Sequence, residues 1–251
     1  MTLDPWQWTL AALCALLTGV AKTGVPGLGI LVVPLMLFAV ADPKQSTGAA
    51  LVLMCAADLF AVFFYRRSAQ WPRLLQLFPW VGAGLCLGVL ALHLFALYRC
   101  DEILLTRLIA VIVLVMIVLH LLRRRLALER LPRGWGAAAA FGVVAGFATT
   151  LANAAGPVMN LYLLSMALPK EEFMGTGAWF FCIINLAKVP LFAFQERITG
   201  ATLALDAVLL PGVVLGALLG RRLFAHVPQQ LFETIVLALA TVATVALFLH
   251  R

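Results

Sequence analysis

Long apolar segments recur along the whole chain and constrain its fold more than any other feature. Splitting the 251 residues at charged positions and at Pro/Gly clusters leaves ten such segments. They cover approximately residues 6–21, 27–41, 47–65, 74–97, 103–122, 135–152, 156–168, 173–194, 203–224 and 230–249. In a bilayer every backbone N–H and C=O must be paired within the protein, which favours α-helices for segments of this length. The sequence therefore predicts an all-α integral membrane protein.

Three of these segments are shorter than the roughly 20 residues that a perpendicular span needs. They are the first, second and seventh, and we expect them to be tilted, broken or re-entrant. No soluble domain is left over, because 64% of the chain is hydrophobic whereas soluble domains average about 45–50%. The first segment lacks the basic start and small-residue cleavage site of a signal peptide, so we expect it to be retained in the membrane.

Basic residues gather in short loops between the apolar segments. The loops contain Arg66, Arg67 and Arg73; then Arg123, Arg124, Arg125, Arg130 and Arg133; and finally Arg221 with Arg222. Short loops rich in Lys and Arg face the cytoplasm, which would place both termini on the non-cytoplasmic side of the cell membrane. The net charge of +7 does not form a basic surface with interleaved aromatic residues, so we expect no nucleic-acid partner.

The two halves of the chain resemble each other. TGVAKTGVPGLG (18–29) aligns with AGFATTLANAAG (145–156), STG (46–48) with GTG (175–177), and PWVGAGLCLG (79–88) with PGVVLGALLG (211–220). Weak repeats of this kind are typical of transporters, and an odd number of crossings per half would invert the second half. We therefore expect two inverted-topology repeats of about five segments each, with short or broken helices near the midplane. The first repeat would cover residues 1–125, a basic cytoplasmic linker 126–134, and the second repeat 135–251.

A lysine lies among helix breakers in AKTGVPGLG, residues 21–29. Pro26 removes a backbone donor, and the glycines permit turns and close backbone approach. Broken membrane helices can aim their positive N-termini at an anion near the midplane, and Lys22 would add a full charge. The predicted anion-binding residues of this segment are Lys22, Thr23, Gly24, Gly27 and Gly29.

The counterpart ATTLANAAGPVMN, residues 148–160, offers neutral groups instead of a lysine. Thr149, Thr150, Asn153 and Asn160 supply donors for the oxygens of an oxyanion. The pair Gly156-Pro157 is typical of a helix start. A site closed from both halves of the chain would therefore be asymmetric.

A third polar group lies in WFFCIINLAKVP, residues 179–190. Asn185 and Lys188 are three residues apart and would share one helix face. The repeat alignment matches Asn185 to Asp58. Ionisable residues inside a membrane are functional candidates by default, so we predict that Lys188 binds the anion and that Asp58 is a coupling residue or an ion-pair partner.

Simpler interpretations stay open for several of these residues. Lys22 and Lys188 could each extend to a membrane interface, and Asp58 could merely pair with a nearby basic residue. Spacings such as Gly84 with Gly88 are typical of helix packing. Asp206 and Glu233 lie near segment ends, where we expect them to meet water.

Metal, cofactor and enzyme functions lack support. The histidines (His93, His120, His226 and His250) show no ligand spacing, and Ser46 and Ser165 lack a GxSxG setting. The five cysteines show no CxxC motif and are expected to be small buried hydrophobic residues. We expect no enzymatic activity, no cofactor and no metal site.

Four stretches of the chain together resemble one family. They are AKTGVPGLGILVVPLM, STGAALVLMCAADLFAVFFYRR, ANAAGPVMNLYLLSM and GTGAWFFCIINLAKVP, and the family is the TauE/SafE sulfite exporter family, also called the 4-toluene sulfonate uptake permease family. The resemblance implies an all-helical protein of two related halves that moves sulfite, organosulfonates or similar anions across the cytoplasmic membrane. The matching positions are Lys22, Thr23, Gly24, Pro26, Gly27, Gly29, Asn153, Gly156, Pro157, Asn160, Thr176, Trp179, Asn185 and Lys188.

These observations predict a secondary transporter of a small sulfur-containing oxyanion that works by alternating access in the lipid bilayer. The predicted anion-binding residues of the second half are Asn153, Gly156, Asn160, Thr176, Trp179, Asn185 and Lys188. Asn185 would supply a donor, as would Thr23 and Asn153, and Trp179 would shape the apolar side of the site. A proton or a sodium ion would be the coupling ion. An anion channel, with the same basic residues lining a pore, is the alternative, since broken helices and basic residues serve both. A non-transporting scaffold would leave the polar motifs without a use. Whether the protein forms a homo-oligomer stays open.

Overall fold

The computed structural model describes residues 3–26, 28–97, 135–153, 155–166 and 168–224, together with Val111, Leu114, Val118 and Leu122. Within these residues the chain forms helices and short turns and no strand. The prediction of an all-α protein is therefore confirmed.

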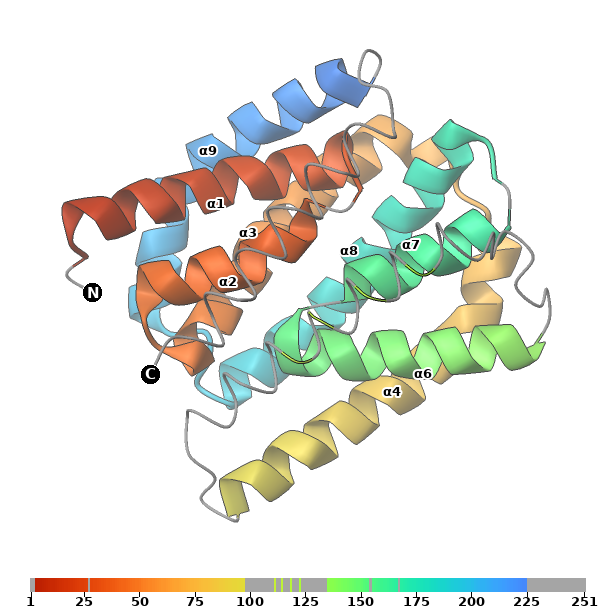
Figure 1. Cartoon of the computed structure of the whole chain (residues 1–251), viewed down its shortest axis with the longest axis horizontal. Helices are drawn as coiled ribbons and strands as arrows, with labels where there is room; N and C mark the ends of the chain where they lie inside the picture. The colour runs from red at the N-terminus through yellow and green to blue at the C-terminus, as the bar shows by residue number, and fades with distance from the viewer. Residues whose placement is uncertain are drawn as a thin grey trace.

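The helices follow the apolar segments of the sequence (Figure 1). They are α1 (Pro5–Thr23), α2 (Gly29–Val40), α3 (Pro43–Tyr65), the short 3₁₀ helix η1 (Arg66–Ser68), α4 (Trp71–Leu97), α6 (Trp135–Ala152), α7 (Ala155–Ser165), α8 (Lys170–Phe194) and α9 (Gly200–Phe224). The predicted segments 103–122 and 230–249 lie outside the described residues, apart from the four single positions named above.

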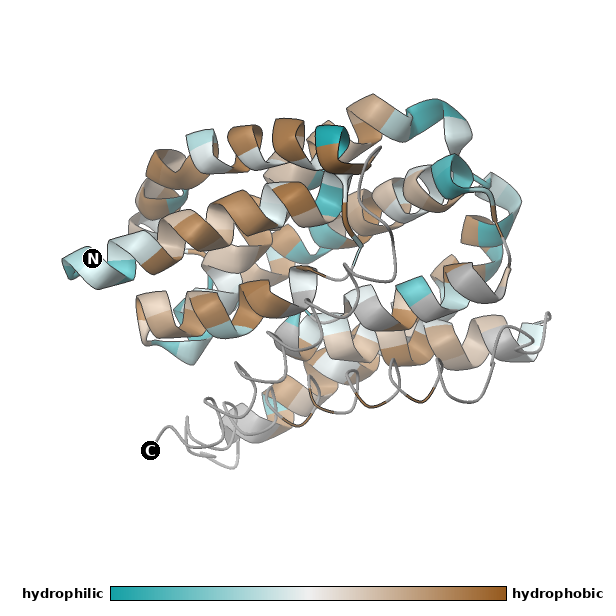
Figure 2. Ribbon diagram, turned by 45° about the horizontal axis from the view of Figure 1, so that its top comes forward, coloured by the Kyte–Doolittle hydropathy of each residue, from teal (hydrophilic) through white to brown (hydrophobic). Residues whose placement is uncertain are grey.

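Several helices are long and apolar enough to cross a membrane. In the part of the chain that the structure describes, the candidate spans are Pro43–Ser68, Trp71–Leu94, Lys170–Phe194 and Gly200–Phe224. By contrast α2 has 12 residues and α7 has 11, too few for a perpendicular span of about 20. Hydrophobic residues recur along every described helix (Figure 2), as expected where lipid is the solvent.

Helices from opposite halves of the sequence pack in pairs. Figure 1 shows α1 beside α9 at one edge of the molecule and α4 beside α6 at the other, and among the described helices these are the two most extensive contacts. Glycines permit both contacts: a Cβ on Gly216 would collide with the backbone of Leu16, and one on Gly84 would collide with that of Val143. This agrees with the predicted packing role of Gly84. Between the pairs, α3 packs against α8.

Two hydrophobic clusters stabilise the bundle. One joins residues of α1, α2, α3 and α9, including Ala11, Met36 and Leu209. The other joins residues of α4, α6, α7 and α8, including Leu77, Ala138 and Leu163. The first cluster includes α3 and the second α8, and between them the polar side chains of Asp58 on α3 and Asn185 on α8 meet in the interior of the bundle.

Candidate functional site

Both predicted helix breaks are present. After α1 ends at Thr23 the chain turns before α2 begins at Gly29, and α6 and α7 are separated by only two residues, one of which is Asn153. Asn153 has a φ of 52°, a left-handed conformation that asparagine tolerates better than most residues. The chain thereby turns after α6, and Asn153 lies in the turn between α6 and α7.

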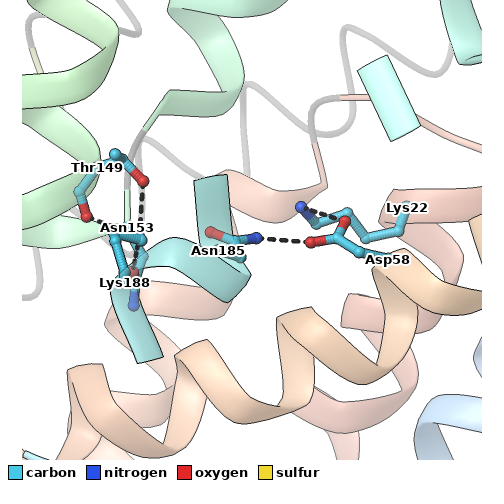
Figure 3. Close-up of polar contacts among 6 residues, drawn as sticks. All are labelled: Lys22, Asp58, Thr149, Asn153, Asn185 and Lys188. Carbon is cyan, nitrogen blue, oxygen red and sulfur yellow. Dashed lines mark hydrogen bonds and ion pairs between the residues drawn. The ribbon is translucent and has the colours of Figure 1, made fainter. Parts of the chain in front are cut away.

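Lys22, Asp58 and Asn185 form one buried group (Figure 3). The Lys22 Nζ lies 2.9 Å from Asp58 Oδ1, and the two side chains are 13% and 0% exposed. Asn185 Nδ2 donates a hydrogen bond of 2.6 Å to the other oxygen, Asp58 Oδ2. The Lys22 ammonium also lies 3.9 Å from the centre of the Phe181 ring. The charge of Lys22 is therefore balanced within the protein.

Lys188 forms a second buried group with a different charge balance (Figure 3). Its residue exposure is 1%, and its Nζ donates to Thr149 O at 3.0 Å, Thr149 Oγ1 at 2.8 Å and Asn153 Oδ1 at 2.7 Å. All three acceptors are neutral. Among the described residues no carboxylate lies within ion-pair distance of Lys188, so its positive charge has no countercharge there. The acceptors lie at the C-terminal end of α6, where the helix dipole favours a cation.

A chain of hydrogen bonds continues from Lys188 to a second buried cation. Asn153 Nδ2 donates to Thr47 O at 2.8 Å, and Arg197 Nη1 donates to Thr47 Oγ1 at 3.0 Å. Arg197 lies between α8 and α9 and is buried. Burial lowers the pKa of Arg197 to about 10, so the guanidinium stays charged at neutral pH. Both cations also approach the ring of Phe192.

Sequence reasoning missed Thr47 and Arg197. Arg197 follows an apolar segment in QERITG (195–200) and looks like an ordinary loop residue. The only available signal was Thr47, the central residue of the STG motif, which the alignment already matched to Thr176 of the second half. Nothing in the sequence indicates that Arg197 is buried against it.

Other predicted site residues contact different parts of the bundle. Thr23 Oγ1 donates to Ala217 O at 2.7 Å, and the space beside Gly24 is filled by the backbone of Gly220, so both hold α1 against α9. Thr176 Oγ1 accepts a hydrogen bond from Gln70 N at 2.9 Å, and Trp179 Nε1 donates to Arg66 O at 3.3 Å. Thr176 and Trp179 therefore attach the start of α8 to the turn that follows α3.

The remaining predicted residues lie near the helix breaks. Within the described part of the chain, Gly29 and Gly156 each have open space where a Cβ would be, and Asn160 is buried on α7. Gly27 lies outside the described residues. The structure thus brings Lys22, Asp58 and Asn185 together, and joins Lys188 to Asn153 and Thr149.

Two expectations are wrong. Asp206, expected to meet water, is 4% exposed because it faces inward from α9; Glu233, expected likewise, lies outside the described residues. Cys86, expected to be buried, is exposed, because it lies beside Leu87 on the outer face of α4, whereas Cys14 and Cys182 are buried and Cys55 partly so. Cys100 lies outside the described residues.

Comparison with known proteins gives one match. The family model for the sulfite exporter TauE/SafE matches residues 11–247. No curated protein and no solved structure matches the chain. The match spans both helix breaks and both buried polar groups, and the family consists of membrane transporters, which implies a multi-pass membrane protein that is not an enzyme. The chain belongs to the TauE/SafE sulfite exporter family.

Proposed function

We propose that the chain is a secondary transporter that moves a small sulfur-containing oxyanion, such as sulfite or a sulfonate, across the cell membrane by alternating access. The observation that supports this most is the wholly buried Lys188, whose ammonium is held by neutral oxygens only. A buried charge without a countercharge is costly, and inside a membrane such a residue marks a functional site by default. An anion would supply the missing charge.

The three hydrogen bonds of Lys188 define how an anion would bind. Each N–H of the ammonium already has an acceptor, so an anion must replace one of them. Thr149 O belongs to the backbone of α6 and Thr149 Oγ1 to a residue inside that helix, whereas Asn153 lies in the turn after α6, so the Asn153 amide is the acceptor that we expect to turn away. A turned Asn153 could then donate its Nδ2 to an oxygen of the anion. Binding would therefore break the bond between Asn153 and Thr47.

The start of α7 offers further donors beside this group. Gly156 lies in the first turn of α7, three residues after Asn153, and among the described residues no heavy atom from another part of the chain lies within 4 Å of the position that a Cβ would occupy. The first N–H groups of a helix are unpaired and attract anions. The proposed anion site therefore consists of the Lys188 ammonium, the Asn153 amide and the start of α7.

Lys22 and Asp58 have a different role in this proposal. Their charges cancel, so the pair adds no net attraction for an anion. Asn185 connects it to α8, the helix that also bears Lys188. We propose that the pair fixes the end of α1 to α3 and α8 next to the anion site, which makes Lys188 rather than Lys22 the main anion ligand.

Matched contacts support two inverted repeats as the basis of alternating access. Thr23 lies beside Gly220, and its aligned counterpart Thr150 lies beside Gly88. Thr47 accepts a hydrogen bond from Arg197, and its counterpart Thr176 accepts one from the turn residue Gln70. Each half thus contacts the other at equivalent positions, as expected of repeats that move against each other around a central site. On this topology both termini would lie on the non-cytoplasmic side.

A binding experiment tests the proposal. Purified protein is titrated with sulfite, sulfate, thiosulfate and methanesulfonate, alongside the variant Lys188→Met and the control Lys44→Met, which changes an exposed lysine. Loss of one charge-assisted hydrogen bond costs about 1.5–3 kcal/mol, so Lys188→Met should bind the preferred anion about 10- to 150-fold more weakly. The control should bind as the wild type does. Equal affinity in all three proteins, with melting temperatures unchanged, would refute the proposed site.

Reconstitution separates a carrier from a channel. A carrier gives saturable flux of the bound anion into liposomes, whereas a pore gives single-channel currents in a planar bilayer. Currents that persist with the anion alone would replace alternating access by the channel mechanism.

A further inference from the structure

One buried acid has no role in the site described above. Asp206 lies on the inward face of α9 and is 4% exposed, and neither of its carboxyl oxygens has a hydrogen-bond partner among the described residues. No lysine, arginine or histidine of the described residues lies within ion-pair distance of it. In this it differs from Asp58, whose two oxygens contact Lys22 and Asn185.

The surroundings of Asp206 are mostly apolar, and the buried hydroxyl of Thr202, one turn earlier on α9, donates to Thr199 O. The neighbours of Asp206 (Leu205, Leu209 and Val213) belong to the cluster that α9 forms with α1, α2 and α3. Among the groups of these helices, the Cys14 thiol lies close enough to interact electrostatically with the carboxyl. That thiol already has an acceptor, Val32 O at 3.4 Å.

The other titratable groups on these helices are engaged elsewhere or lie far along the chain. On α1 and α3 they are Lys22, Lys44, Cys55, Asp58 and Tyr65; α2 has none; α9 itself adds Arg221 and Arg222 near its end. Lys22 pairs with Asp58, Lys44 with the exposed Glu196, and Tyr65 donates to the backbone of Thr23.

Packing does not require an acid at this position. The repeat alignment of 79–88 with 211–220, extended upstream, matches Asp206 to Leu74, Leu209 to Leu77 and Val213 to Val81. All three residues of the first half are buried in the equivalent cluster around α4. Where the first half has a leucine in its core, the second half therefore has a carboxyl group.

An unpartnered carboxylate in such surroundings is costly, and the group avoids the cost by taking up a proton. A metal cation such as sodium is a poor alternative occupant, because hard cations need several oxygen ligands and the cluster of α1, α2, α3 and α9 offers only hydrocarbon and sulfur side chains, none of which carries an oxygen. A proton needs only the carboxyl itself. The chemistry of the position is therefore that of a proton carrier.

We propose that Asp206 is the proton-binding site of the transporter: its carboxyl holds a proton in the conformation described here and releases it to water when α9 moves against α1. The step is a simple protonation, in which a carboxylate and a proton give a carboxylic acid and the reverse step restores both. The inference rests on the proposed transport function, because coupling needs a transported anion. It adds a second site, on α9, to the anion site of α6, α7 and α8.

Infrared spectroscopy tests the proton site without any substrate. Membranes containing the wild type at neutral pH should show the C=O stretch of a protonated carboxylic acid shielded from water. The band should vanish in Asp206→Asn and in Asp206→Leu, the residue found at the matched position of the first half. It should persist in Glu171→Gln, which neutralises an exposed acid at the start of α8. A wild-type spectrum without this band, or a band that survives both Asp206 variants, would overturn the proposal.

Transport then tests coupling. Methanesulfonate is the probe, because its charge does not change near neutral pH. We expect an imposed pH gradient to change its flux into liposomes severalfold for the wild type and for Glu171→Gln, and to leave the flux of both Asp206 variants unchanged. Equal dependence on the gradient in all four proteins would refute a coupling role for Asp206. Absence of any anion flux from the wild type would instead refute the proposed transport function, while the infrared result would still decide whether Asp206 binds a proton.

Discussion

Removal of Lys22 should destabilise the protein strongly, because it strands a buried carboxylate. The Lys22 Nζ and Asp58 Oδ1 are 2.9 Å apart, and Asp58 is 0% exposed. At that separation two unit charges attract by about 6 kcal/mol with an effective dielectric constant near 20. Part of this only offsets the cost of burying both charges, so breaking a buried pair by removing one partner costs about 3–5 kcal/mol.

The two single variants should lose different amounts of stability. Lys22→Met leaves the fully buried Asp58 with Asn185 as its remaining partner, so we expect the full 3–5 kcal/mol, roughly. Asp58→Asn leaves a lysine that is 13% exposed and lies over the Phe181 ring. That lysine can recover some solvation, so we expect about 1–3 kcal/mol.

A double-mutant cycle measures the pair itself. Free energies of unfolding are obtained from denaturant titrations in detergent for the wild type, Lys22→Met, Asp58→Asn and the double variant. The double variant buries no lone charge, so it should be more stable than Lys22→Met, with a coupling energy of about 2–3 kcal/mol. Single effects that add to within about 0.5 kcal/mol would refute the pairing and restore Lys22 as a candidate for direct anion contact.

Three further changes test the site and the packing around it. Asn153→Asp places a carboxylate where Lys188 now meets a neutral oxygen at 2.7 Å. The anion affinity measured by calorimetry should fall at least about 10-fold, while the melting temperature stays the same or rises. An unchanged affinity would contradict the site. Gly216→Leu puts a side chain into the backbone of Leu16, so the free energy of unfolding in detergent should fall by more than about 2 kcal/mol. An unaltered melting temperature would mean that α1 and α9 do not touch there. Tyr65→Phe removes a hydrogen bond of 2.7 Å to the end of α1 and should cost about 1 kcal/mol by the same measurement, whereas a neutral effect would show that this bond is replaced by water.

The helices and their breaks were predictable because both depend on local sequence. Apolar length locates the helices, and Gly and Pro next to Lys22, together with the Gly156-Pro157 step, locate the breaks between α1 and α2 and between α6 and α7. The packing of α1 against α9 was harder to predict from the sequence. The glycines of both helices indicated close packing, but a small residue does not specify its partner.

The charge balance of the interior could not be predicted. Lys22 and Lys188 look alike in sequence, since each is flanked by apolar residues of a predicted membrane region. The difference arises from Asp58, which is 36 residues from Lys22 along the chain and forms an ion pair with Lys22 rather than with Lys188. The same limit explains Asp206: its nearness to a segment end suggested contact with water, whereas its orientation on α9 depends on tertiary packing.

The most direct test of the proposed function is an experimental structure of the protein determined with its preferred anion bound. We expect one oxygen of the anion within about 2.7–3.2 Å of the Lys188 Nζ, the Asn153 amide turned away from that ammonium, and the ion pair of Lys22 and Asp58 intact. An anion bound instead at Lys22 with that pair broken, or elsewhere with Lys188 still held by Asn153, would contradict the account.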